Sequence, residues 1–201
     1  MSSLLYKNAY LYEWLLSAFH FGSWGKRYQL MSGLIGKNKK VLDLGCGSGI
    51  TAKFLDRSCE YTGIEENPKF VNHARKKKLN IIQGNLFNID FPKVDVVVIS
   101  DVLHHVYPNH EKLLKKALKA ASILIICEPD HNKGAINFLG KNKLFFRFFG
   151  DNDGINTFES MSDWDYSEEE FKNLLEKFGK AKIYQLGNSF IAKVTGWDQV
   201  S

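Results

Sequence analysis

The chain has 201 residues, of which 44% are hydrophobic and 24% are charged, the composition of an ordinary globular protein. Its length favours a single domain that buries a substantial core. Lysine and arginine number 27 against 22 acids, and the resulting charge of +5 is too small to indicate a polyanionic partner by itself. Cys46, Cys59 and Cys127 stand singly, which excludes CxxC zinc spacing and favours a reducing compartment over a disulfide framework.

The first 38 residues are rich in aromatic and apolar residues and predict a helical N-terminal cap. Lys7 and Glu13 interrupt the apolar start, so no run approaches the roughly 20 residues that span a bilayer. A basic lead and a small-residue cleavage site are also missing. We therefore expect a soluble, cytoplasmic protein, in which this segment either packs on the core as a cap or closes over a pocket as a lid.

From residue 39 the chain alternates between strand-like and helix-like patterns. Short apolar or β-branched runs predict strands, and amphipathic runs predict helices. The strands are expected at 39–44, 61–65, 80–83, 94–100 and 122–128, and the helices at 50–57, 67–78 and 110–121. Asn67 can cap the second helix and Pro68 can occupy its first position. This alternation predicts a parallel sheet covered by helices on both faces.

The end of the chain has a different pattern. Residues 131–166 form an irregular insertion or lid between the core at 39–130 and the closing elements at 167–201. A capping box from Ser167 to Glu170 opens a helix that is expected to end at Gly179. The stretch "AKIYQLGNSFIAKV" then predicts two strands joined by a tight turn at Gly187 and Asn188.

The stretch "VLDLGCGSG" at 41–49 places glycines directly after the first strand. Ligands of open parallel sheets bind beyond the carboxyl ends of the strands, where this loop lies. Gly45 and Gly47 allow unusual backbone angles and close ligand approach, and the next helix presents free N–H groups. Glu65 ends the second strand, where a carboxylate can accept hydrogen bonds from two ribose hydroxyls. Together they indicate an adenosine-type ligand.

The glycine spacing is GxGxG, whereas dinucleotide enzymes use GxGxxG, whose last glycine would fall at Ile50. The ordered motifs "VLDLGCGSG", "YTGIEENP", "GNLFNIDFP", "VDVVVISDVLHHV" and "ILIICEP" resemble those of class I S-adenosylmethionine-dependent methyltransferases. With the closing hairpin, the resemblance covers about two thirds of the chain. It implies an α/β, Rossmann-like domain whose seven-stranded, mostly parallel sheet has the order 3-2-1-4-5-7-6, with the last strand antiparallel.

The resemblance also implies S-adenosylmethionine as the cofactor and gives roles to the residues at the strand ends. The methionine end would lie over Gly45 and Gly47, with Asp43 orienting its ammonium group. Glu65 would hold the ribose. For Asp43 the alternative is that it only caps or braces the loop.

Further candidate cofactor contacts follow in the chain. Asn85 stands where relatives often carry an aspartate that faces the adenine amine, and its amide oxygen can still accept that hydrogen bond. Leu86 would pack on the ring. Three neighbours of these positions complete the set of candidate cofactor-binding residues, namely Cys46, Glu66 and Ser100. Cys46 could instead be a small packing residue, and Glu66 could face solvent, because neighbours on a strand point in opposite directions.

The segment "SDVLHHV" after the fourth strand supplies the candidate catalytic residues. Asp101 and His104, with His105 next to them, are expected to line the acceptor pocket, where an imidazole could take a proton from the acceptor. Alternatively, one histidine only braces the loop. We predict no metal site, because His104, His105 and His110 have no acidic or cysteine partner at ligand spacing.

The acceptor is expected to be a small, partly hydrophobic or lipid-like molecule. Amine-directed nucleic-acid methyltransferases resemble one another in an Asn/Asp-Pro-Pro-aromatic stretch after the fourth strand. This chain has "SDVL" there, without prolines, and the missing resemblance disfavours a nucleic-acid acceptor. The basic, phenylalanine-rich residues 138–149 could close an apolar pocket or contact a membrane surface, or could pack as a core helix. The alternative functions are a cofactor-binding partner subunit without turnover, an NAD(P)-dependent oxidoreductase and an RNA methyltransferase.

Overall fold

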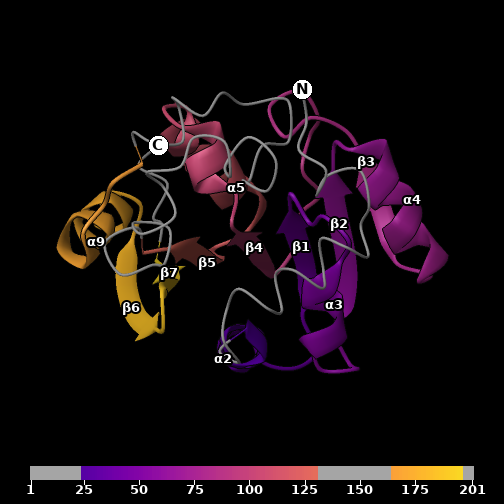
Figure 1. The fold of residues 1–201 in the computed structure, drawn as a ribbon, viewed down its shortest axis with the longest axis horizontal. Helices are drawn as coiled ribbons and strands as arrows, with labels where there is room; N and C mark the ends of the chain where they lie inside the picture. The colour runs from indigo at the N-terminus through magenta and orange to yellow at the C-terminus, as the bar shows by residue number, and fades with distance from the viewer. Residues whose placement is uncertain (1–23, 131–163, 197–201) are drawn as a thin grey trace, which may run out of the picture.

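The computed structural model describes residues 24–130 and 164–196, which form one seven-stranded sheet (Figure 1). Its order is β3-β2-β1-β4-β5-β7-β6. β7 runs antiparallel to β5 and β6, and the other pairs are parallel. The strands are β1 (Lys40–Leu44), β2 (Glu60–Glu65), β3 (Asn80–Gln83), β4 (Val96–Ser100), β5 (Ile123–Pro129), β6 (Lys180–Leu186) and β7 (Ser189–Thr195). The predicted strand order and the antiparallel last strand are confirmed.

Helices cover both faces of this sheet, as the alternating pattern predicts. They are α2 (Trp24–Ile35), α3 (Ile50–Phe54), α4 (Pro68–Lys76), α5 (His110–Ala120) and α9 (Glu168–Glu176), with a short 3-10 helix η2 (Leu103–Val106). Figure 1 shows α2 and α3 on one side of the sheet and α5 and α9 on the other. The predicted cap and insertion at 1–23 and 131–163, including the phenylalanine-rich residues 138–149, lie outside the described residues.

The alternation of side chains along β1 explains how the two layers are held. Leu42 and Leu44 are fully buried in a cluster with leucines of α5 and with Phe171 of α9. Val41 points the other way and packs in a second cluster with Met31 of α2. Because successive strand residues face opposite sides, the three apolar residues of this five-residue strand supply the core on both faces.

Local signals in the sequence set the helix ends. The Asn67 side chain accepts a hydrogen bond from the Lys69 N–H at the start of α4, and both bonds of the capping box at Ser167 are present. The prediction that α9 ends at Gly179 was wrong, because the helix ends at Glu176. Gly179 instead precedes β6 with φ 140°, where an added Cβ would lie 2.6 Å from the Thr195 carbonyl oxygen.

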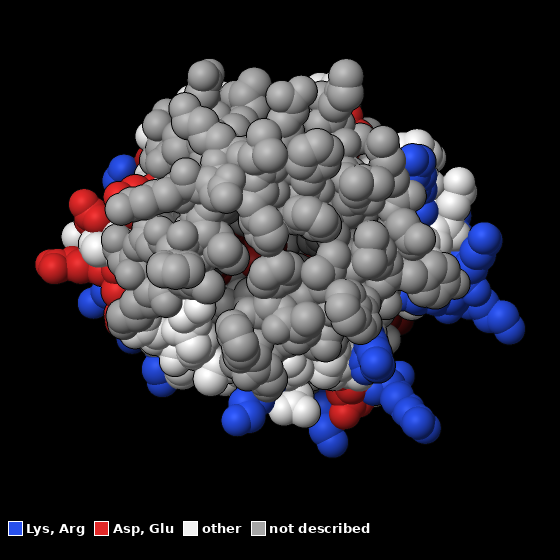
Figure 2. All heavy atoms as spheres, in the orientation of Figure 1, with Lys and Arg blue, Asp and Glu red and all other residues white. Residues whose placement is uncertain are grey.

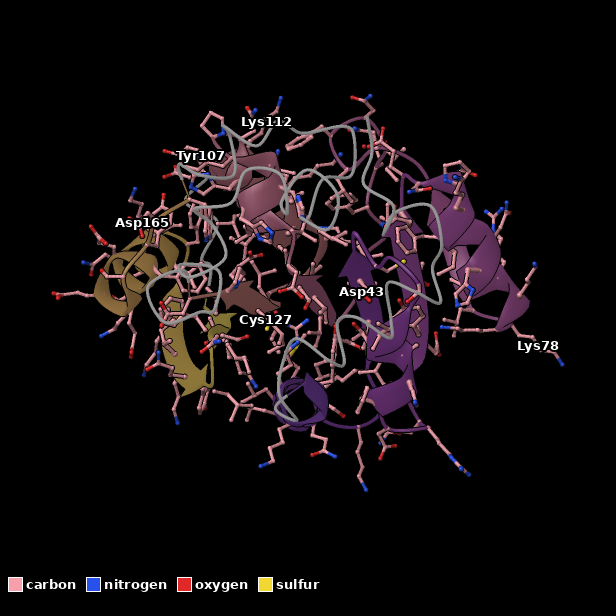
Figure 3. The ribbon with its side chains drawn as sticks, in the orientation of Figure 1. Asp43, Lys78, Tyr107, Lys112, Cys127 and Asp165 are labelled. Carbon is pink, nitrogen blue, oxygen red and sulfur yellow. The ribbon has the colours of Figure 1, made fainter. Side chains whose placement is uncertain are left out.

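Most charged side chains lie on the outside of the described fold, and Arg27, Asp43, Glu128 and Asp130 are the buried exceptions among the described residues. Figure 2 shows basic side chains along the right and lower edges, and acidic side chains gathered at the left edge with basic ones beside them. Figure 3 shows Lys78 pointing outward beyond α4. The lysines at the end of α4 and the glutamates that open α9 are exposed, as expected for solvated faces. Within the described ranges, no helix combines the length and apolarity needed to cross a membrane.

Candidate functional site

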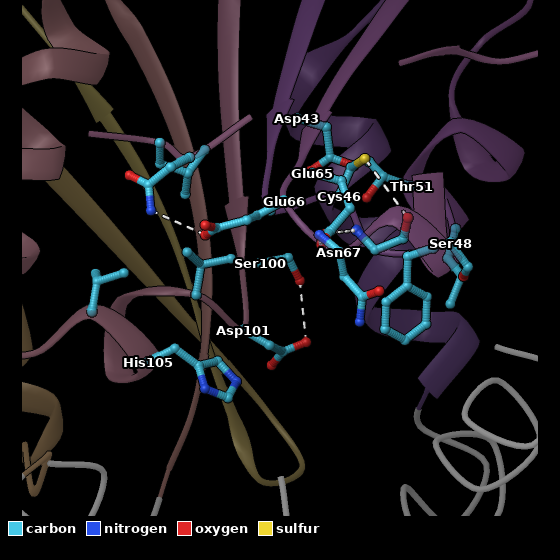
Figure 4. Close-up of a pocket in the computed structure, with 18 of the residues that line it drawn as sticks. Asp43, Cys46, Ser48, Thr51, Glu65, Glu66, Asn67, Ser100, Asp101 and His105 are labelled. Carbon is cyan, nitrogen blue, oxygen red and sulfur yellow. Dashed lines mark hydrogen bonds between the residues drawn. The ribbon is translucent and has the colours of Figure 1, made fainter. Parts of the chain in front are cut away.

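A cavity of about 330 Å³ opens at the carboxyl ends of the central strands. Residues after β1, β2 and β4 line it, together with Tyr28 of α2 (Figure 4). The strand order reverses between β1 and β4, and this switch point is where open α/β sheets bind ligands. The cavity size falls in the range of small-molecule sites.

One wall of the cavity is the glycine loop (residues 45–49). Gly45, Gly47 and Gly49 have φ of 65°, 53° and 75°, a left-handed backbone that side chains disfavour. An added Cβ at Gly47 would meet no heavy atom of the described residues within 4 Å, so a ligand can approach the bare backbone there. The Ser48 hydroxyl also lines the cavity, is buried, and has no hydrogen-bond partner among the described residues. Sequence reasoning missed Ser48.

Glu65 joins the glycine loop to the end of β2. One carboxylate oxygen accepts a hydrogen bond from the Gly47 N–H at 2.9 Å, and the other accepts one from the Asn67 N–H at 2.7 Å. Burial raises the pKa of Glu65 above its ordinary value, although these bonds oppose the shift. Glu65 also lines the cavity, and a carboxylate offers about four acceptor sites in all. Glu65 therefore both braces the loop and remains able to accept hydrogen bonds from a ligand.

Asp43, near the end of β1, lines the cavity and is only 2% exposed. Its Oδ2 accepts a hydrogen bond from the Tyr61 hydroxyl at 2.9 Å, and Thr51 also bonds the side chain. Burial nevertheless raises the pKa of Asp43 to about 7. No cation of the described residues pairs with this buried carboxyl, which is poorly solvated as an anion. A bound cation would therefore favour its ionised form.

The cavity is also lined by three residues that follow β2 and β3, which are Glu66, Asn85 and Leu86. The Asn85 amide oxygen accepts a hydrogen bond from the Phe87 N–H at 2.9 Å, and its nitrogen donates to Glu66 at 3.0 Å. The Lys116 ammonium of α5 donates to the Leu86 carbonyl at 2.8 Å and fixes this wall. Glu66 is exposed but holds Asn85.

Cys46 lines the cavity from within the glycine loop but its side chain is buried. Burial raises the pKa of the Cys46 thiol above its ordinary value, with the Asp43 carboxylate adding to the shift. A thiol held protonated is a packing group rather than a nucleophile. An added Cβ at Gly63 would lie 2.5 Å from its sulfur, so the two residues fit closely.

The opposite wall is the β4 turn (residues 101–107), which begins with Asp101. Asp101 lines the cavity with its side chain 24% exposed, and its backbone is left-handed, with φ 56°. The buried Arg27 of α2 forms an ion pair with both of its carboxylate oxygens. Ser100 Oγ lies 3.3 Å from the same carboxylate. The Arg27 Nη2 also donates to the Tyr28 hydroxyl at 3.1 Å.

Arg27 was not identified from the sequence as a residue of the site, although its position in the helix indicates a buried charge. It shares a helical face with Met31 and Ile35, which pack on the sheet. A charged residue at a position of apolar periodicity indicates a buried partner. The partner is 74 residues away along the chain, and only the tertiary structure identifies it.

The two histidines of the β4 turn point in different directions. His105 lines the cavity (Figure 4). His104 does not, because its side chain is buried, and its Nδ1 lies 2.6 Å from Glu128 of β5. The rings are 4.2 Å apart between centroids. The structure thus brings Asp101 and His105 to the cavity and gives His104 the bracing position. In the described part of the chain, no three His, Cys, Asp or Glu residues gather as a metal site.

Comparisons with known proteins agree with this geometry. Residues 42–122 match the family model described as "Methyltransferase domain". A fatty-acid O-methyltransferase of Mycolicibacterium smegmatis is 29% identical over 91 residues, which are 41% of this chain and 33% of that protein. A ubiquinone biosynthesis O-methyltransferase of Coxiella burnetii is 28% identical over 88 residues, 39% of this chain and 37% of that protein. The chain therefore matches about a third of the length of these curated relatives.

The fold extends beyond the matched segment. A crystal structure of an S-adenosylmethionine-dependent methyltransferase from Thermotoga maritima superposes with a TM-score of 0.69, covering 95% of this chain and 97% of that one at 16% identity. The residues present fit the cofactor, since the backbone at Gly47 is open and Glu65 faces the cavity beside it. Residues 42–122 therefore match a methyltransferase domain, and the described fold is that of S-adenosylmethionine-dependent methyltransferases.

Proposed function

We propose that this chain transfers the methyl group of S-adenosylmethionine to a small, partly apolar organic acceptor. The observation that carries the proposal is that one cavity is bounded by both the glycine loop and the β4 turn. The glycine loop and Glu65 suit a nucleoside, and the β4 turn offers a separate wall across the same space. Cofactor and acceptor can therefore be held in contact, which is the main requirement of a direct displacement.

The cofactor half would be held by the residues around β1 and β2. Glu65 would accept hydrogen bonds from the ribose, and Asp43 would face the ammonium group. Asn85 and Leu86 would lie against the adenine. The bound cofactor supplies the electrophilic methyl group, so the chain's own task is alignment and exclusion of water.

The acceptor half combines apolar side chains with a titratable one. Val102, Val106 and Tyr107 line the cavity beside His105. Arg27 already occupies the Asp101 carboxylate with an ion pair, so Asp101 is a poor proton acceptor. We assign His105 as the group that takes a proton from the acceptor, since a neutral imidazole does so near pH 7.

The named relatives support an acceptor of this class. One is a fatty-acid O-methyltransferase and the other a ubiquinone biosynthesis O-methyltransferase. The valines of the β4 turn provide the apolar contact that such an acceptor would need.

Two measurements test the proposal. Calorimetric titration with S-adenosylmethionine and with NAD should show binding of the first alone, and binding of NAD alone would indicate an oxidoreductase. Incubation with methyl-labelled cofactor and decanoic acid, protocatechuic acid or a transfer-RNA fraction should then label a small molecule. Label in the RNA would contradict the proposed acceptor class, and binding without any turnover would indicate a partner subunit.

A further inference from the structure

Glu128 is a carboxylate inside the core, at the end of β5 and 0% exposed. Its Oε1 accepts hydrogen bonds from the Val102 N–H at 2.9 Å and the Leu103 N–H at 2.7 Å. Its Oε2 lies 2.6 Å from Nδ1 of His104. One side chain therefore contacts three consecutive residues of the β4 turn.

These contacts supply hydrogen bonds to amides of the turn that its own helix cannot pair. The turn begins with Asp101, whose backbone is left-handed. This conformation is unfavourable for most residues other than glycine. The Val102 and Leu103 amides open the short 3-10 helix, where no helical carbonyl is available to them. Glu128 supplies the acceptor for both amides. A buried carboxylate is tolerated because it has several strong donors.

The opposite side of the same turn forms the wall of the cavity. Val102, His105 and Val106 line it, and the His105 ring contacts the His104 ring in a tilted arrangement, with the centroids 4.2 Å apart. The positions of these side chains therefore depend on the residues that hold the turn from behind.

We propose that Glu128 and His104 are a positioning pair that holds the β4 turn in the geometry needed to receive the methyl acceptor. This inference rests on the proposed function, because it takes the β4 turn as the acceptor wall. Neither residue lines the cavity. Their effect is transmitted through the Val102 and Leu103 backbone and through the His105 ring.

The test uses the full chain with two disruptive variants and a conservative partner for each. Glu128→Leu removes both acceptor oxygens, whereas Glu128→Gln keeps a carbonyl oxygen for the two amides. His104→Leu fills similar space without a donor, whereas His104→Asn can still donate to Oε2. Glu60→Gln, at an exposed position of β2, is the matched control.

Three readouts separate positioning from general stability. Hydrogen exchange at the Val102 and Leu103 amides should accelerate about 10- to 100-fold in Glu128→Leu. Turnover of the probe that wild type methylates should fall by a similar factor of about 10 to 100, with a raised KM, because a small misplacement is sufficient. Cofactor affinity by calorimetry should stay within about twofold of wild type, because the glycine loop is untouched. Both conservative variants should restore most of the turnover.

The outcomes are distinguishable from failure of the proposed function. Unchanged exchange and turnover in both leucine variants would overturn the inference. So would a parallel loss of cofactor affinity and turnover, which would indicate a purely structural role. If Glu128→Leu does not fold, His104→Leu decides by the same criteria. A wild-type protein that methylates none of the probes counts against the proposed function, and the exchange and affinity measurements still decide the positioning role.

Discussion

The glycine loop and the β4 turn face each other across the cavity and obtain unusual backbone geometry in different ways. The glycine loop reaches left-handed angles with residues that adopt them without a side-chain penalty. The β4 turn places Asp101 in the same region, held by Arg27 from α2 and followed by amides bonded to Glu128. One conformation is intrinsic to its residues, and the other is imposed by tertiary contacts.

This difference predicts which substitutions disturb each wall of the cavity. The glycine loop should respond mainly to substitutions within itself, whereas the β4 turn should respond to changes far away in the chain. The two walls also touch, because an added Cβ at Gly45 would lie 2.7 Å from a Val102 methyl group. Four predictions test this comparison, from the largest expected effect to the smallest.

Arg27→Met should lower the free energy of unfolding by about 3 kcal/mol, because it leaves the partly buried Asp101 carboxylate without its cation. Urea unfolding followed by circular dichroism measures this. Adding Asp101→Asn should recover part of the loss, since asparagine tolerates the left-handed backbone and carries no charge. If the double variant is no more stable than Arg27→Met, the ion pair does not hold the turn.

Glu65→Ala should weaken cofactor binding by about 2–4 kcal/mol, since it removes charge-assisted acceptors of the ribose and the brace on Gly47. Isothermal titration calorimetry gives the affinity. Glu60→Ala is the matched control, because Glu60 is exposed at the start of β2 and is not among the residues that line the cavity. Equal affinities for the Glu65 variant and wild type would remove Glu65 from the site.

Asp43→Asn should change how stability depends on pH. The native pKa of about 7 exceeds the ordinary value of 3.8, so the folded state keeps a proton that the unfolded chain has released. Wild-type stability should therefore fall as pH rises from 5 to 7, by about 2 kcal/mol, and the variant should lack this fall. Melting of the ligand-free protein at both values checks the sign. If the stability of the variant depends on pH as strongly as that of wild type, the raised pKa does not belong to Asp43. We also expect the variant to bind the cofactor more weakly, because it lacks the carboxylate charge.

Gly45→Ala and Gly47→Ala should separate the two walls. Both place a side chain at positive φ, which costs about 1 kcal/mol. Gly45→Ala should lose about 1 kcal/mol more through its contact with Val102. Gly47→Ala should lose cofactor affinity instead, because its new methyl group lies in open cavity space. Thermal melts of both variants give their stabilities, and calorimetric titration gives their cofactor affinities. If the two variants lose equal stability and equal affinity, the two walls are not distinct.

Most helices and strands of the described fold could be predicted from the sequence, because the patterns that specify them are local. The capping contacts at Asn67 and Ser167 and the β-branched run of β4 depend on neighbours within a few residues. The end of α9 was misplaced because Gly179 was interpreted as a helix terminator. Its close approach to Thr195 of β7 is a long-range contact that no local pattern reveals.

The candidate site divides in the same way. The glycine-loop residues and Glu65 followed from spacing along the chain, and the structure brings them together at one cavity. The adjacent histidines could not be separated from sequence, because both were compatible with the pocket. The buried carboxylate of Glu128 pairs with His104, which turns that ring into the core and leaves His105 at the cavity.

The sequence by itself determined the order of strands and helices, the glycine loop and the acid that follows the second strand. These features depend on periodicity, capping and backbone freedom, which act over short distances. Only the tertiary structure decided how the β4 turn is held, because Arg27 and Glu128 reach it from α2 and β5. Such pairings arise when a buried charge must find its partner, and the chain brings the two together only by folding.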